Sequence, residues 1–250
     1  MNLLKSDLLE PNKDSITNAF SSFLQKEAKY KNQYLQCNYK NAFDGYSFMG
    51  QKDSLNQYDF DMLHSFVLSD FHAIKEFPVE FQPFLINEWP KLISKVKEHE
   101  LKIIEKYQLP FEELYKEDKM GYMMSCNYYP KPKEIGIRNN NQLRLSTHPD
   151  VSLFTTFPYG IKEGLSYYEN EKRIELKEQT KTISFLGYFA EFFSNKKNFA
   201  LEHQVELPTD FSSERYSFAV FSIPKPTSTF IVNQKEISGK EYYDKYLSIF

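Results

Sequence analysis

Two stretches, GYMMSCNYY at residues 121–129 and RYSFAVFSI at residues 215–223, decide the fold class. Both are runs of aromatic, small and β-branched residues, which are typical of buried β-strands. Similar short runs, separated by turn residues, recur between and after them at the spacing expected of an all-β barrel or sandwich. We expect nine strands, and so two facing sheets, at residues 122–129, 142–146, 152–157, 165–168, 173–176, 182–186, 199–205, 215–223 and 229–232.

The sequence before residue 120 indicates helices and irregular structure instead. Apolar residues recur at helical spacing after Asp14 and Ser15, either of which can cap a first turn, and again after Pro90. We expect helices near residues 14–24, 90–109, 111–116 and 239–250, and loops with short elements at residues 37–80. No linker or repeat divides the chain, so residues 1–250 are expected to form one domain with helices outside one sheet.

Composition narrows the function. The 31 basic and 34 acidic residues give a net charge of −3, which argues against nucleic-acid partners. Two cysteines, no signal peptide and no long apolar run predict a cytoplasmic protein that does not span a membrane. Aromatic residues make up 17% of the chain, which predicts a thick core or a ring-lined cavity.

A candidate metal site lies in the strand-rich half. His148 and Asp150 are two residues apart, so on an extended chain their side chains point to the same side. His203, on a later strand, supplies a third ligand. Two histidines and one carboxylate on one face of an octahedron suit a ferrous ion whose open positions bind dioxygen and an organic chelator.

A candidate carboxylate site accompanies the metal site. Arg215 and Ser217 share one face of the next strand, where a guanidinium and a hydroxyl can hold a carboxylate. Asn127 and Tyr129 also alternate onto one side of their strand and can contact the same ligand.

These residues lie in four motifs whose order and composition resemble one known family. The motifs are NYYP at 127–130, HPDVSLFT at 148–155, SN at 194–195 leading to HQV at 203–205, and RYS at 215–217. The chain resembles the 2-oxoglutarate and Fe(II)-dependent oxygenases, and among them the isopenicillin N synthase-like branch. The resemblance covers about residues 120–226, departing at Tyr188 and Gln204, where many relatives carry Asp and Arg.

The resemblance implies a mainly β fold, a cupin-like double-stranded β-helix or jelly roll with flanking helices. Residues 1–118 would be an abbreviated helical N-terminal part, 120–232 the core and 239–250 a C-terminal helix. It implies iron bound by His148, Asp150 and His203, and 2-oxoglutarate bound by Arg215 and Ser217 with help from Asn127 and Tyr129.

The reaction implied by the resemblance is the oxidative decarboxylation of 2-oxoglutarate with dioxygen, coupled to oxidation of a second substrate. Hydroxylation of a small molecule, such as an amino acid, a peptide-like compound or another specialised metabolite, is the expected outcome, by a monomer. Candidate substrate contacts follow the metal motif and line the last long strand, with two more in the loop between Gly45 and Gly50: Phe154, Thr156, Tyr159, Phe218, Phe221, Tyr46 and Met49.

Three other functions fit the same residues. An iron oxidase of the isopenicillin N synthase kind would not use 2-oxoglutarate, and Arg215 and Ser217 would then bind the carboxylate of the substrate itself. A cupin-like isomerase or hydrolase would use another metal chemistry. A non-catalytic jelly roll that binds a ligand is disfavoured, because it would have no need for a metal triad together with a carboxylate clamp.

Overall fold

The computed structural model describes residues 3–40, 43–51, 61–136, 143–162, 164–169, 172–177, 179–197, 199–208 and 212–249. Its two facing sheets agree with the expected jelly roll. The strands are β1 (Leu4–Ser6), β2 (Gly45–Ser47), β3 (His64–Ser69), β4 (Met120–Tyr129), β5 (Leu143–His148), β6 (Phe154–Phe157), β7 (Leu165–Glu169), β8 (Lys172–Leu176), β9 (Thr182–Leu186), β10 (His203–Glu206), β11 (Arg215–Pro224), β12 (Thr229–Val232) and β13 (Lys235–Ser238).

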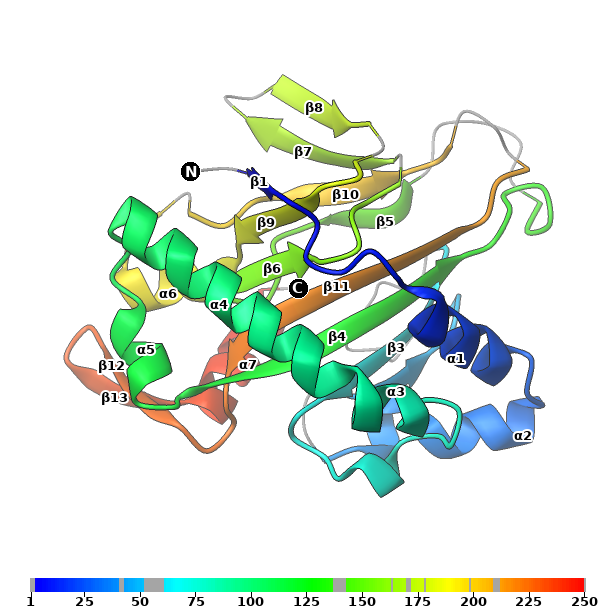
Figure 1. Cartoon of the computed structure of the whole chain (residues 1–250), viewed down its shortest axis with the longest axis horizontal. Helices are drawn as coiled ribbons and strands as arrows, with labels where there is room; N and C mark the ends of the chain where they lie inside the picture. Colours follow the sequence, from blue (N-terminus) through cyan, green and yellow to red (C-terminus); the bar gives the residue numbers. More distant parts are fainter. Residues whose placement is uncertain are drawn as a thin grey trace.

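The major sheet has seven strands in the order β1-β9-β6-β11-β4-β3-β2, and the minor sheet has four in the order β5-β10-β7-β8. All their pairings are antiparallel, and a separate hairpin joins β12 to β13. The long strands β4 and β11 run side by side through the middle of the molecule (Figure 1). Most residues of both strands are buried, so the centre of the sheet is covered on both faces.

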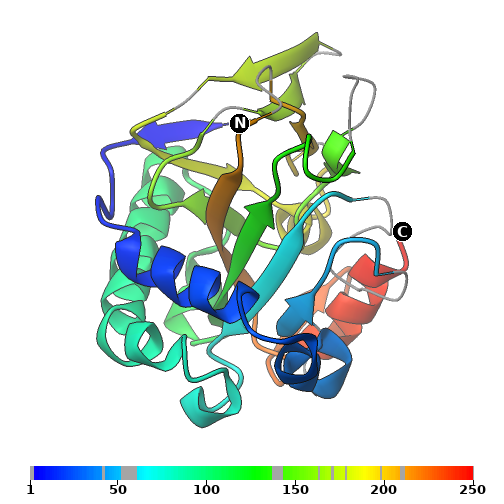
Figure 2. The same cartoon turned by 90° about the vertical axis from the view of Figure 1, so that its right-hand side faces the viewer.

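Helices lie outside the sheets, and the longest of them covers the outer face of the major sheet. They are α1 (Asp14–Leu24), α2 (Ala28–Lys31), α3 (Gln82–Asn87), α4 (Trp89–Tyr107), α5 (Glu112–Lys116), α6 (Tyr188–Ser194) and α7 (Gly239–Leu247), with single 3₁₀ turns at Asn32–Tyr34, Gln36–Asn38 and Ile74–Glu76. Figure 2 shows α1 and α4 on one side of the central strands and α7 on the other. None of the helices within the described ranges is both long and apolar enough to cross a bilayer.

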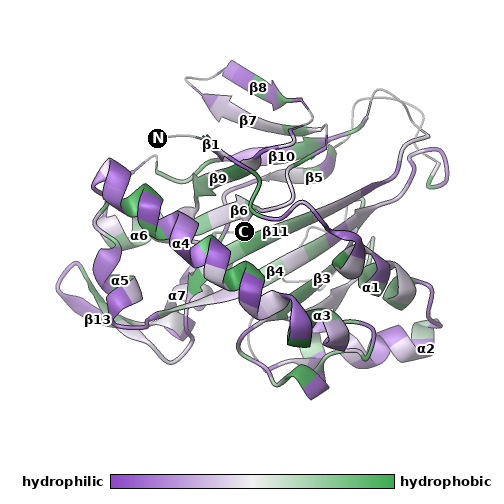
Figure 3. Ribbon diagram, in the orientation of Figure 1, coloured by the Kyte–Doolittle hydropathy of each residue, from purple (hydrophilic) through white to green (hydrophobic). Residues whose placement is uncertain are grey.

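Alternation along β4 and β11 divides the interior into two cores. Phe218 and Val220 of β11, with Met124 and Cys126 of β4, pack against apolar residues of α1, α3 and α4. The intervening residues face the minor sheet. Figure 3 shows hydrophobic residues concentrated in the central strands, whereas α4 also carries a hydrophilic stripe toward solvent. This is the amphipathic pattern of a helix that covers a sheet.

The sequence-based expectation for residues 1–118 was incomplete. Three strands from this part, β1, β2 and β3, join the major sheet, and β3 pairs directly with β4. The pattern of residues 64–69, HSFVLS, is that of a strand buried on both faces, which periodicity alone does not reveal. In addition, Asp14 lies inside α1, and its backbone N–H donates to the Asn12 side chain rather than Asp14 acting as the cap.

Candidate metal and cosubstrate site

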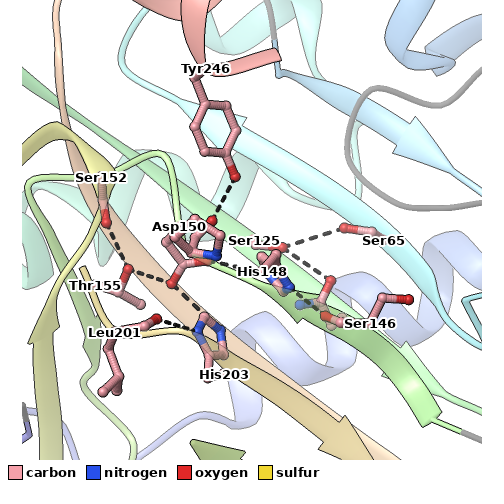
Figure 4. A network of polar contacts seen from close by, with 12 residues as sticks. Ser65, Ser125, Ser146, His148, Asp150, Ser152, Thr155, Leu201, His203 and Tyr246 are labelled. Carbon is pink, nitrogen blue, oxygen red and sulfur yellow. Dashed lines mark hydrogen bonds and ion pairs between the residues drawn. The ribbon is translucent and has the colours of Figure 1, made fainter. Parts of the chain in front are cut away.

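The paired ends of two minor-sheet strands bring the triad together. His148 ends β5, His203 begins β10, and the two residues are directly opposite each other in the ladder. Asp150 follows two residues after His148, and its carboxylate lies 3.5 Å from Nε2 of His148 and 3.7 Å from Nε2 of His203. One ligand atom from each residue lies within 4.8 Å of the others. Figure 4 shows the three side chains close together.

The backbone orients both imidazoles for metal binding. Nδ1 of His148 lies 2.6 Å from the Ser146 carbonyl, and Nδ1 of His203 lies 3.1 Å from the Leu201 carbonyl. Because a carbonyl can only accept, each Nδ1 carries the proton and each Nε2 keeps a free lone pair. Two such nitrogens and one carboxylate oxygen, arranged around one metal position, form a set of ligands that fits Fe(II).

Hydroxyl groups fix the third ligand. Thr155 donates from Oγ1 to Oδ2 of Asp150 over 2.6 Å, and Ser152 Oγ lies 2.7 Å from the same threonine oxygen. Gly187 packs against the loop that carries Asp150 and Ser152. A Cβ added at Gly187 would lie 2.5 Å from the Ser152 carbonyl oxygen and 2.7 Å from the Asp150 carbonyl oxygen. Only glycine allows this close approach, so the loop holds Asp150 in one place.

The C-terminal helix α7 also holds the loop. Tyr246 donates to the carbonyl of Pro149 over 2.9 Å, and Tyr242 donates to the carbonyl of Val151 over 2.6 Å. The two tyrosines are one helical turn apart, so they anchor the peptide groups on both sides of Asp150. In Figure 4, Tyr246 lies above the triad, and its hydroxyl group points toward the metal loop.

The charges of the triad compensate each other. Burial alone would raise the pKa of Asp150, but His203, His148 and the Thr155 hydroxyl lower it below the usual value. Burial would lower the pKa of His148, but Asp150 raises it, whereas for His203 burial prevails and lowers the pKa. Asp150 is therefore a carboxylate at neutral pH, the form that binds a cation.

The predicted carboxylate site lies on β11 and β4. Arg215 pairs with Tyr129, and Ser217 pairs with Asn127, so the four residues form two adjacent rungs of the ladder. The buried Arg215 guanidinium lies 3.5 Å from Ser217 Oγ and 5.3 Å from the centre of the Tyr129 ring. A buried guanidinium beside a hydroxyl can bind a carboxylate through several charge-assisted hydrogen bonds.

A cavity of about 110 Å³ between the sheets joins the two sites. The metal triad, the four residues of the carboxylate site and Phe221 all line it, and the remaining lining residues are mostly apolar. They are Phe43, Leu63, Ser65, Val67, Met123, Ser125, Leu145, Val151, Phe157, Leu165, Val205, Ala219 and Tyr246.

Six of the predicted substrate contacts do not line this cavity: Phe154, Thr156, Tyr159, Phe218, Tyr46 and Met49. Strand alternation explains most of them, because the even-numbered residues of β6 and β11 face away from the cavity that Phe157 and Phe221 face. Tyr159 packs edge-on against Phe218. Tyr46 is directed to the outer core and is hydrogen-bonded to His64, and Met49 lies in the turn after β2.

Sequence reasoning missed several residues that the structure places around the site. Ser125 and Met123 continue the alternation that starts at Tyr129 and Asn127, so the sequence did contain a signal for them. Ser65 and Val67 belong to a strand that was not expected. No sequence signal points to the tyrosines of α7, because their role depends on where the helix docks.

A model of the family described as the 2OG-Fe(II) oxygenase superfamily matches residues 120–224. These residues contain β4, the whole triad and β11. This part of the chain, less than half of its 250 residues, is similar to the 2OG-Fe(II) oxygenase superfamily. The triad supplies the two histidines and one carboxylate that fit Fe(II), and the matched family is one of Fe(II)- and 2-oxoglutarate-dependent oxygenases.

Solved structures share the fold over most of this chain. JOX2, crystallised with 2OG, Fe and JA, is 20% identical with a TM-score of 0.71, covering 98% of this chain and 78% of its own. A full-length Neurospora crassa protein, crystallised in complex with alpha-KG and 5-formyluracil, is 18% identical with a TM-score of 0.70, covering 99% of this chain and 85% of its own.

The Arabidopsis thaliana dioxygenase for auxin oxidation 1, in complex with 2-oxoglutarate, is 16% identical with a TM-score of 0.67, covering 90% of this chain and 84% of its own. These identities establish the fold and leave the substrate open. A search among curated protein sequences found no match.

Proposed function

We propose that the protein hydroxylates a small organic molecule in the cavity, with His148, Asp150 and His203 as the iron ligands. The observation that carries the proposal is the convergence of this triad and Arg215 on one cavity between the sheets. When bound, iron supplies the activation of dioxygen that decarboxylates 2-oxoglutarate to succinate and oxidises the substrate.

The chain's own residues would bind and orient the reactants. Arg215 and Ser217 bind the distal carboxylate of 2-oxoglutarate, and Tyr129 and Asn127 flank it on the neighbouring strand. The keto-acid end then extends along the cavity toward the triad. The apolar walls exclude water, which favours reaction with the substrate over side reactions.

The test is spectroscopic. Adding 2-oxoglutarate to the anaerobic Fe(II) protein should produce a visible charge-transfer band, as expected when the keto acid chelates the iron. A protein that binds Fe(II) but shows no band, and that consumes oxygen without forming succinate, would instead be an oxidase in which Arg215 binds the substrate.

Replacement of Arg215 by Leu should raise the concentration of 2-oxoglutarate needed for half of the band by at least about tenfold. A buried charge-assisted hydrogen bond contributes more than about 1.4 kcal/mol, which is the equivalent of that factor. Arg173→Leu, which removes an exposed arginine paired with Glu206 on the minor sheet, is the matched control and should leave the titration unchanged. An unchanged titration in the Arg215 variant would contradict the assignment.

A further inference from the structure

The cavity floor changes in character along the paired strands. Successive rungs of cavity-lining residues across β11, β4 and β3 are Arg215–Tyr129, then Ser217–Asn127–Ser65, then Ala219–Ser125–Val67, and then Phe221–Met123. The β3 residue of the fourth rung, Ser69, does not line the cavity and donates to Asp44. The first two rungs are polar and hold the one arginine of the described lining. The last two are apolar except for one hydroxyl. The floor therefore has a polar end, which can bind a carboxylate, and an apolar end.

The walls above the apolar end are equally uncharged. Phe43, Val151 and Phe157 line it, and Tyr246 adds a phenol whose proton is donated to the Pro149 carbonyl. Among the described lining residues, the charged or titratable groups other than the two tyrosines are the triad and Arg215. The proposed function commits these four to iron and to 2-oxoglutarate.

We infer that the substrate of this enzyme is an uncharged, mainly apolar molecule and not an amino acid or another ion. This inference rests on the proposed function. An ionised carboxylate or ammonium at the apolar end would lose its hydration without meeting an opposite charge among the described lining residues. Hydrogen bonds to hydroxyl groups do not compensate for that cost. An apolar molecule would gain from burial against the same walls.

Ser65 and Ser125 supply the polar contact that orients such a molecule. Ser125 donates to Oδ1 of Asn127 over 3.0 Å, and its oxygen lies 3.4 Å from that of Ser65. The proton of Ser125 is therefore committed, so Ser65 is the donor in the Ser65–Ser125 hydrogen bond. Because 3.4 Å is long for such a bond, Ser65 can turn its proton to an acceptor on the substrate. A carbonyl, ether or hydroxyl oxygen on an otherwise apolar skeleton fits this arrangement.

The experiment compares probes that share an apolar skeleton and differ in the charge of their polar end group. The first series is 3-phenylpropanamide, 3-phenylpropanoate and 3-phenylpropylammonium, and the second is octanamide, octanoate and octylammonium. Binding is measured by ligand-observed NMR to the full chain loaded with Zn(II) and saturated with 2-oxoglutarate, so that Arg215 is occupied. We expect the amide in each series to bind at least tenfold more tightly than either ion.

A matched pair of variants tests the cause. Val67 is buried in the floor of the apolar end, and Val67→Asp places a carboxylate there, whereas Val67→Asn places a neutral group of nearly the same shape. The Asp variant should bind the ammonium probes at least tenfold more tightly than the Asn variant does. The amide probes should not show this difference.

Two results would overturn the inference: an ion that binds the unaltered protein as tightly as the amide of its series, or a failure of both amides to bind. Failure of the proposed function is recorded separately, since it appears as the absence of the 2-oxoglutarate band in the Fe(II) protein with no probe present. A protein with the band and a preference for ions would keep its function and lose the inferred substrate class.

Discussion

Thr155 and Thr156 are adjacent in β6, and each forms a buried hydrogen bond, but only one bonds to the metal site. Thr155 donates to Asp150, whereas Thr156 Oγ1 lies 3.0 Å from Ser184 Oγ on the other face of the sheet. We predict that Thr155→Val weakens metal affinity by about 10- to 100-fold, because residues that hold a ligand in place contribute that much.

Thr156→Val is the control for this prediction, since it removes a similar bond without touching a ligand. Both variants should lower the free energy of unfolding by about 1 kcal/mol. Metal affinity is measured by calorimetric titration with Co(II), which needs no turnover. Equal affinities in the two variants would show that Thr155 does not position Asp150.

At the scale of the element, helix α7 connects the C-terminal part of the chain to the metal loop. Tyr242 is fully buried and donates to the Val151 carbonyl, whereas the adjacent Tyr243 donates to the Pro224 carbonyl, away from the loop. We predict that Tyr242→Phe lowers Co(II) affinity by about tenfold, because the loop gains freedom at Asp150.

Tyr243→Phe provides the comparison on the same helix. It should cost a similar free energy of unfolding, about 1 kcal/mol for a buried hydrogen bond, and leave Co(II) affinity unchanged. If both tyrosines affect stability alone, then α7 covers the site without positioning it.

At the scale of the whole molecule, one buried carboxyl joins three elements. Glu100 of α4 is fully buried, and its Oε2 accepts hydrogen bonds from Tyr115 of α5 over 2.8 Å and from Tyr122 of β4 over 3.0 Å. Burial raises its pKa to about 8, although the hydrogen bonds from Tyr115, Tyr122 and Ser222 and the charge of Lys97 lower it. Glu100 is therefore protonated in the folded protein at neutral pH.

This pKa makes the stability depend on pH. In the unfolded chain Glu100 ionises near its usual pKa of 4.5, so between pH 4.5 and about 8 the folded state holds a proton that the unfolded state has lost. The free energy of unfolding should then fall as pH rises, by up to about 1.4 kcal/mol per pH unit from this group, and level off outside that window.

Glu100→Gln should remove this contribution, so that the variant gains stability relative to the unaltered protein between pH 5 and pH 8. Urea unfolding at several pH values measures the difference. Glu98→Gln, on the exposed side of the same helix, should keep the original slope. Parallel curves for Glu100→Gln and the unaltered protein would mean that the carboxyl is ionised in the folded state.

The sequence predicted the strands of the jelly roll well, because short apolar runs and turn residues are local signals. It also named the three residues of the triad, which the structure brings together, and the four residues of the predicted carboxylate site, which line the same cavity. It did not predict β3 or the role of Tyr242, since a strand buried on both faces has no alternation and a docking helix carries no mark of its target. The even-numbered residues predicted as substrate contacts do not line the cavity, because they were chosen without first deciding which face of each strand points inward.

The two-sided nature of β4 and β11 bears on how such a protein can evolve. Odd-numbered positions on these strands line the cavity, and even-numbered positions pack toward the helices. Substitutions at the odd positions can alter which compound is oxidised while the scaffold keeps its stability. Substitutions at the even positions can alter the stability while the cavity keeps its specificity. New specificities can therefore arise on this framework by changing every second residue.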